Sequence, residues 1–132
     1  LFVTTSVFAG ILRSPEDLIE AFFNAWRLNN TTYISVLSGN PQKGLSSFGN
    51  TITRAKVLDY SIETQEQIGS YRILKTRIKL KSTDYGLRKF TLYFFLKKVD
   101  GSWVWEEGID FSKLGYEPTP KRALALYLFL RR

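Results

Sequence analysis

Two carboxylates are the side chains whose type and position could carry acid–base chemistry. Alternation along an expected strand places Glu107 on the same face as Trp103 and Trp105, where apolar surroundings would raise the pKa of its carboxyl toward that of a general acid. Asp59 lies on another expected strand, on the face that we expect to meet solvent. Unpaired carboxylates are seldom buried, so we favour a solvated strand end for Glu107 and assign no catalytic residue.

Several kinds of chemistry are excluded by composition. The 132 residues include no Cys and no His. Disulfides, thiolate catalysis and cysteine-based metal sites are therefore ruled out, and the commonest general base and transition-metal ligand is missing. We expect no metal site and no cofactor.

A row of cations is the second candidate site. Lys75, Arg77, Lys79 and Lys81 share one face of an expected strand, and Lys89 and Lys97 extend that face onto the next strand. With a net charge of +7, the row could meet an acidic protein or an anionic membrane surface. Nucleic acid is the less favoured partner, because no nucleic-acid motif accompanies the charge. A solvated, charged sheet face is the plain alternative.

Aromatic side chains form the third candidate. They could line a pocket for a small apolar ligand, or they could be the hydrophobic core, which we favour because Leu and Ile alternate among them. The set comprises Trp26, Tyr60, Phe94, Trp103 and Trp105.

The elements that must position these side chains begin with a helix. Ser14 can cap its first turn, and Pro15 suits the first helical position. The residues at 29–30 end this helix, and Thr31 or Thr32 can cap a short second one. The apolar stripe of the first helix comprises Leu18, Ile19, Phe22, Phe23, Ala25 and Trp26.

After a Gly- and Ser-rich loop at residues 39–50, the pattern changes to the period of strands. Four segments follow with short links, which indicates an antiparallel meander. Asp100 and Gly101 form a hairpin turn before the last segment. The side chains expected to face the core are Leu58, Tyr60 and Ile62, then Leu74, Thr76, Ile78 and Leu80, then Phe90, Leu92, Phe94 and Leu96.

Three stretches together resemble the NTF2-like superfamily, in its DUF4878-like cell-envelope branch. They are SPEDLIEAFFNAWRLNN, TTYISVLSG and TLYFFLKKVDGSWVWEEG, and the matching positions are Pro15, Leu18, Phe22, Phe23, Trp26, Asp100, Gly101 and Trp103. The resemblance implies an α+β fold in which N-terminal helices pack on a curved antiparallel sheet, a cystatin-like cone. That superfamily includes enzymes, ligand carriers and envelope assembly modules, so the fold alone leaves function open.

We divide the chain into three parts. Residues 1–13, of which 1–12 carry no charged side chain, are a remnant of a signal or anchor, or an N-terminal packing segment. Residues 14–115 are the NTF2-like domain. Residues 116–132 are a basic and apolar extension, which could dock on the body, bind a partner or lie in a membrane interface.

The function that we expect is a non-catalytic binding or assembly module of a bacterial or archaeal cell envelope. It would act through a protein partner or self-association, outside the cytoplasm or at a membrane. The alternatives are a small lyase, isomerase or hydrolase, or a carrier of an apolar ligand, each using the cone.

Overall fold

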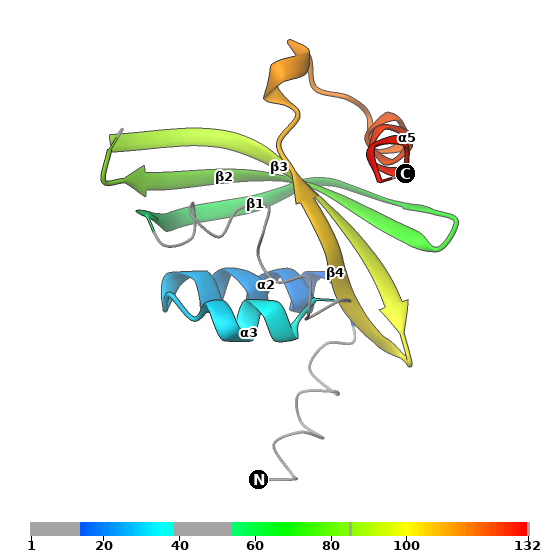
Figure 1. The fold of residues 1–132 in the computed structure, drawn as a ribbon, viewed down its shortest axis with the longest axis horizontal. Coiled ribbons are helices and arrows are strands. Elements are labelled where there is room, and N and C mark those ends of the chain that lie inside the picture. The colour runs from blue at the N-terminus through cyan, green and yellow to red at the C-terminus, as the bar shows by residue number, and fades with distance from the viewer. Residues whose placement is uncertain (1–13, 39–53, 85, 132) are drawn as a thin grey trace, which may run out of the picture.

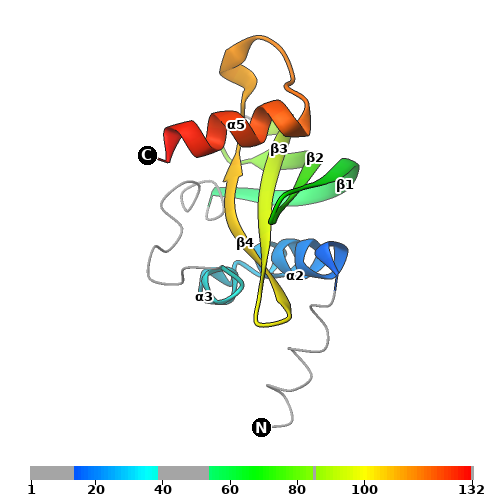
Figure 2. The same cartoon turned by 90° about the vertical axis from the view of Figure 1, so that its right-hand side faces the viewer.

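The computed structural model describes residues 14–38, 54–84 and 86–131, which form three layers (Figure 1). Helices α2 (Pro15–Arg27) and α3 (Thr31–Val36) cover one face of a curved sheet, and α5 (Pro120–Leu130) lies on the other. The view turned by 90° shows the sheet between these two helical layers (Figure 2). The predicted α+β class, with N-terminal helices on a curved antiparallel sheet, is confirmed.

The first two helices begin as side-chain capping dictates. Ser14 accepts a hydrogen bond from the backbone N–H of Asp17 at 3.1 Å, and proline occupies the first turn. The cap of α3 is Asn30, which accepts from the backbone N–H of Tyr33 at 3.0 Å. The predicted cap at Thr31 or Thr32 is wrong by one or two positions, because the amide side chain of residue 30 is the capping group.

The sheet is the predicted antiparallel meander, with the strands in the order β1-β2-β3-β4. In the last hairpin, Asp100 and Gly101 have φ values of 51° and 80°, which a two-residue turn between twisted strands requires. A short 3₁₀ turn, η2 (Ser112–Leu114), follows the sheet. The strands are β1 (Ala55–Ile68), β2 (Tyr71–Ser82), β3 (Gly86–Val99) and β4 (Ser102–Ile109).

A bulge near the start of β1 changes which side chain is buried. Val57 pairs with Leu80 and Asp59 pairs with Lys79, so Leu58 is an extra residue between the two pairs. Val57 is 5% exposed and Leu58 is 46% exposed. The predicted burial of Leu58 is therefore wrong, because one inserted residue interrupts the alternation of side chains along a strand.

Two hydrophobic cores lie on opposite faces of the sheet. The larger core packs α2 and α3 against the concave face, and the smaller core packs α5 against the second face. Strand β3 contributes to both, since Phe94 and Leu96 lie in the first core and Tyr93 and Phe95 in the second. All four side chains are at most 1% exposed. The face of β3 that carries Lys89 and Lys97 is therefore not solvated throughout, because between them Phe95 stacks on Tyr127 of α5 and Tyr93 packs on Phe111.

The C-terminal extension forms a helix that docks on the second face. Thr119 caps α5, and Ala123, Leu124 and Tyr127 are its buried residues. The predictions made for residues 1–13 and for the loop at residues 39–50 lie outside the described residues.

Candidate functional site

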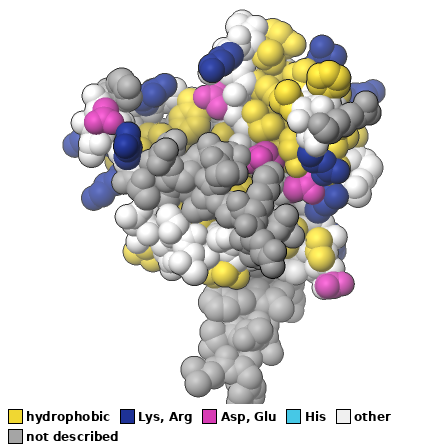
Figure 3. Space-filling view, in the orientation of Figure 1, with side chains coloured by type: hydrophobic (Ala, Val, Ile, Leu, Met, Phe, Trp, Pro, Cys, Tyr) yellow, Lys and Arg dark blue, Asp and Glu magenta, His cyan; other side chains and the backbone are white. Residues whose placement is uncertain are grey.

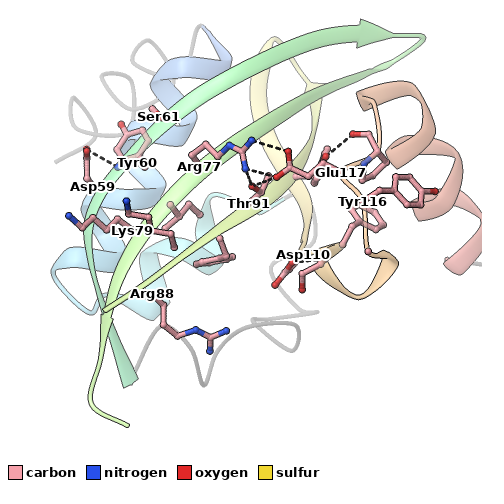
Figure 4. Close-up of a pocket in the computed structure, with 18 residues that line it drawn as sticks. Asp59, Tyr60, Ser61, Arg77, Lys79, Arg88, Thr91, Asp110, Tyr116 and Glu117 are labelled. Carbon is pink, nitrogen blue, oxygen red and sulfur yellow. Dashed lines mark hydrogen bonds and ion pairs between the residues drawn. The ribbon is translucent and has the colours of Figure 1, made fainter. Parts of the chain in front are cut away.

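A pocket of about 830 Å³ opens on the second face of the sheet. Its floor is formed by residues of β1, β2 and β3, and its wall by residues between 110 and 118, which connect β4 to α5. Figure 4 shows Lys79 and Arg88 on one side of the pocket, and Asp110 and Tyr116 on the other. The alternation of side chains along the strands predicts which residues form the floor of the pocket. The position of the wall depends on the path of the chain after β4, which alternation does not predict.

Two residues that line this pocket, Arg77 and Glu117, belong to a cluster of four charged side chains. The Arg77 guanidinium pairs with Glu117 and, at 3.0 Å, with Glu63. The Lys75 ammonium reaches Glu63 at 2.9 Å and Glu117 at 3.0 Å. Thr91 completes the group by donating to Glu117 at 3.0 Å. The cluster ties the 110–118 connection to β1, β2 and β3. The dashed lines in Figure 4 show the part of it in which Glu117 meets Arg77 and Thr91.

Acid should weaken this cluster, and Glu117 should account for part of the loss. Hydrogen bonds from Arg77 and Lys75 lower the pKa of Glu117 to about 2, against about 4.3 in an unfolded chain. A depressed pKa contributes stability that is present above the unfolded value and lost as the pH falls from about 5 to 2. Glu117→Gln should therefore flatten the decrease in unfolding free energy over this range, measured by urea titration at several pH values.

The effect should be modest and salt-sensitive, because the Glu117 side chain is 44% exposed. Glu66→Gln is the matched control, since Glu66 makes no ion pair among the described residues. An acid slope that is the same in Glu117→Gln as in the parent would contradict the role given to this carboxylate.

A second polar cluster lies where α5 crosses the sheet. The Glu106 carboxylate accepts from the hydroxyls of Tyr127 at 2.6 Å and Tyr71 at 2.8 Å. It also pairs with Arg131 at 2.9 Å and Lys97 at 3.4 Å. Burial alone would raise the pKa of Glu106, but these donors and cations lower it on balance. Burial and the bond to Glu106 raise the pKa of Tyr127. The cluster holds α5 on the sheet.

The aromatic set falls largely in the concave core. Trp26, Phe94 and Trp105 are at most 3% exposed, whereas Tyr60 and Trp103 are partly buried and pack against that core. The indole N–H groups of Trp26 and Trp105 donate to backbone carbonyls at 3.0 Å.

Ring contacts fill the space between α2 and the sheet. The Phe22 ring meets Phe94 at 5.1 Å and Trp105 at 5.6 Å between centroids, both edge to face. Phe23 stacks on Tyr60 at 4.2 Å and on Trp26 at 5.9 Å. In the part of the chain that the structure describes, the concave side of the sheet is thus occupied by the protein's own rings.

The two candidate carboxylates lie on the second face of the sheet, away from these rings. Asp59 lines the pocket and accepts from the next backbone N–H at 2.8 Å. A bulge after Trp105 makes Glu107, rather than Glu106, the register partner of Phe95, which lies under α5. The prediction that Glu107 shares a face with Trp103 and Trp105 is therefore wrong, because the inserted residue at the bulge interrupts the alternation of side chains along β4.

The basic row divides into two halves. Lys75 and Arg77 are paired with carboxylates, as described above. Lys79 and Lys81 make no ion pair within residues 14–38, 54–84 and 86–131. The positive potential therefore lies toward the end of the sheet where β1 starts and β2 ends.

Sequence reasoning missed the residues that organise the second face. Glu117 lies in what reads as a proline-rich link, yet it meets Arg77, which is 40 positions away in the chain. Glu106 and Tyr127 meet across 21 positions. Nothing local to either residue marks these contacts. The signal that could have found them is the all-apolar run of residues 92–96, which is typical of a strand covered on both faces.

No group of three or more potential metal ligands occurs among the described residues. Nor does any described helix have the length and apolar character needed to cross a membrane.

Comparisons with known proteins find likeness in structure only. No protein-family model and no curated protein matches the chain. The solution structure of a SEC-C motif containing protein from Rhodopseudomonas palustris has a TM-score of 0.65 at 16% identity, over 75% of this chain and 80% of that one. The crystal structure of a DUF4783 family protein from Bacteroides ovatus has a TM-score of 0.51 at 17% identity, over 74% and 93%.

An LEH-like epoxide hydrolase from M. tuberculosis has a TM-score of 0.47 at 13% identity, over 67% of this chain and 77% of that one, and nothing about activity follows from it. Identities this low show shared fold alone. The chain shares with the first two structures an α+β fold, which here is a curved antiparallel sheet wrapped over its N-terminal helix.

Proposed function

We propose that this protein is a non-catalytic binding module that acts through contacts with another protein. The observation that carries the proposal is the concave core, where Phe22, Phe94 and Trp105 occupy the space that a ligand or substrate would need. A fold whose interior is packed must do its work on its outer surfaces. The candidate carboxylates lie outside this core, so we do not favour the enzyme alternative.

The outer face of α5 is the surface that we assign to the partner. Phe129 and Leu130 are 69% and 68% exposed, and Ala125 and Leu126 lie on the same helix beside the buried Tyr127. Figure 3 shows hydrophobic side chains on the α5 side of the molecule with cations near them. A grouped apolar surface with a charged rim is typical of an interaction site.

The charges on α5 favour an acidic partner over a second copy of this chain. Lys121 and Arg122 stand at the start of the helix, and Arg131 caps its end. Two copies packed through α5 would bring these cations close to one another, in either relative orientation. An apolar patch with acidic residues around it would instead be complementary to this surface.

We also propose that the module works in the cell envelope, outside the cytoplasm or at a membrane. The uncharged stretch at residues 1–12 and the resemblance to DUF4878-like proteins support this placement. Fractionation of the native gene product tests it, and recovery only in the cytosol would contradict it.

Site-specific photo-crosslinking in the native cell tests the docking surface. Phe129→benzoylphenylalanine should give one adduct with a protein whose contact surface is apolar with an acidic rim. Leu58→benzoylphenylalanine is the control, because Leu58 is 46% exposed but lies on β1. Adding Leu130→Lys should abolish the adduct while the folded spectrum is retained. Adducts only with lipid, only with a second copy, or equal at both positions would contradict the proposal.

A further inference from the structure

Two lysines on the floor of the pocket face each other across neighbouring strands. Lys79 of β2 is the register partner of Lys89 of β3, and both line the pocket. Like charges directly opposite each other destabilise a sheet. Neither lysine forms an ion pair with any residue that the structure describes. Asp59 of β1 is the register partner of Lys79 and also lines the pocket, so the two adjacent lysines have one carboxylate opposite them across the sheet.

The carboxylates that line the pocket are already engaged by the protein. Glu117 bonds to the Arg77 guanidinium at 2.9 Å and to other partners in its cluster. Asp59 accepts from the following backbone N–H at 2.8 Å, and Asp110 accepts from the N–H two residues further on at 2.9 Å. Four lining cations, Arg77, Lys79, Arg88 and Lys89, outnumber these three carboxylates, so the net charge of the pocket lining is positive.

The wall opposite the lysines is apolar and aromatic. Phe111 is 8% exposed and packs edge to face on Tyr93, with ring centroids 5.2 Å apart. Tyr116 is 54% exposed, so its ring has surface to lose against a ligand. Pro118 continues the wall, and its carbonyl accepts from the Tyr93 hydroxyl at 2.6 Å. The wall is thus anchored to the sheet beneath it.

We infer that this pocket binds an anionic group, a carboxylate or phosphate carried on an apolar or aromatic body. Lys79 and Lys89 hold the anion through charge-assisted hydrogen bonds, and the body lies against Tyr116 and Phe111. The anion also relieves the repulsion between the two lysines. The pocket is separate from the outer face of α5, so this inference and the proposed protein contact stand or fall independently.

Titrations followed by ¹H–¹⁵N correlation spectra of the full chain test the inference. The probes are 2-naphthyl phosphate, 2-naphthoate, neutral 2-naphthamide and inorganic phosphate. We expect saturable shifts for 2-naphthyl phosphate or 2-naphthoate at the amides of Lys79, Lys89 and Tyr116. The tighter of the two identifies the anion, and the neutral amide and inorganic phosphate should each bind about tenfold more weakly or worse.

Charge variants supply the matched controls. Lys79→Gln with Lys89→Gln should weaken binding about tenfold or more, whereas Lys79→Arg with Lys89→Arg should restore most of it. Lys98→Gln with Lys121→Gln removes the same charge from two lysines that do not line the pocket, and it should leave the dissociation constant unchanged. Shifts outside the pocket, equal binding of the neutral amide or of inorganic phosphate, or full affinity without the two lysines would overturn the inference.

Discussion

Phe22→Ala should lower the free energy of unfolding by about 3–5 kcal/mol, a typical cost for removing a fully buried phenylalanine ring. The side chain is 0% exposed and has edge contacts with Phe94, Trp105 and Phe23 at 5.1, 5.6 and 5.5 Å. Rings on three sides cannot collapse fully into the space, so a cavity remains and adds to the lost transfer free energy. Equilibrium urea unfolding measures the change.

Leu28→Ala is the control for this prediction. Leu28 follows the same helix but is 78% exposed, so its truncation should change the unfolding free energy by no more than about 0.5 kcal/mol. A loss below about 1 kcal/mol for Phe22→Ala would mean that the ring has little to pack against. That result would return the cone to the list of candidate pockets.

Tyr127→Ala should lower the free energy that docks α5 on the sheet by about 3–5 kcal/mol, and so release the helix. The ring is 4% exposed and stacks on Phe95 with centroids 4.5 Å apart. Its hydroxyl donates to Glu106 at 2.6 Å, so removing it also deprives a half-buried carboxylate of a donor. Amide hydrogen exchange should show lost protection in α5 and retained protection in α2.

Two further variants separate the contributions at this position. Tyr127→Phe keeps the stacking and removes the donor, and it should cost about 1–3 kcal/mol. Phe129→Ala truncates an aromatic ring of the same helix that is 69% exposed, and it should leave the protection of α5 unchanged. Protection of α5 that survives Tyr127→Ala would show that the cluster around Glu106 does not hold the helix.

The fold follows from local signals that act within a few residues. The cap at Ser14, the helical stripe that includes Phe22, and the turn at Asp100 and Gly101 were all readable, and each appears as expected. The bulge at Leu58 was not readable, because an inserted residue leaves the composition of a strand unchanged and reveals itself only in the pairing.

The site was less predictable, because its charges are arranged by distant contacts. Arg77 looked like one cation of a solvated row, but Glu117 reaches it from the connection after the sheet. The same alternation placed Lys79 on that face, but it could not show that Arg77 would pair with two carboxylates while Lys79 makes no ion pair among the described residues. Pairing of this kind depends on the path of the chain after β4, and no short-range pattern encodes that path.

Xenon binding, followed by methyl ¹H–¹³C spectra under gas pressure, tests the packed cone most directly. Xenon enters dry apolar cavities in proteins, and Ile19, Ile34 and Leu74 are core residues whose methyl groups report on this region. We predict no saturable shift of these methyl groups in the parent protein, and clear shifts in Phe22→Ala, which opens a cavity for comparison. Saturable shifts in the parent would show an open cone, and they would contradict a function confined to the outer surfaces.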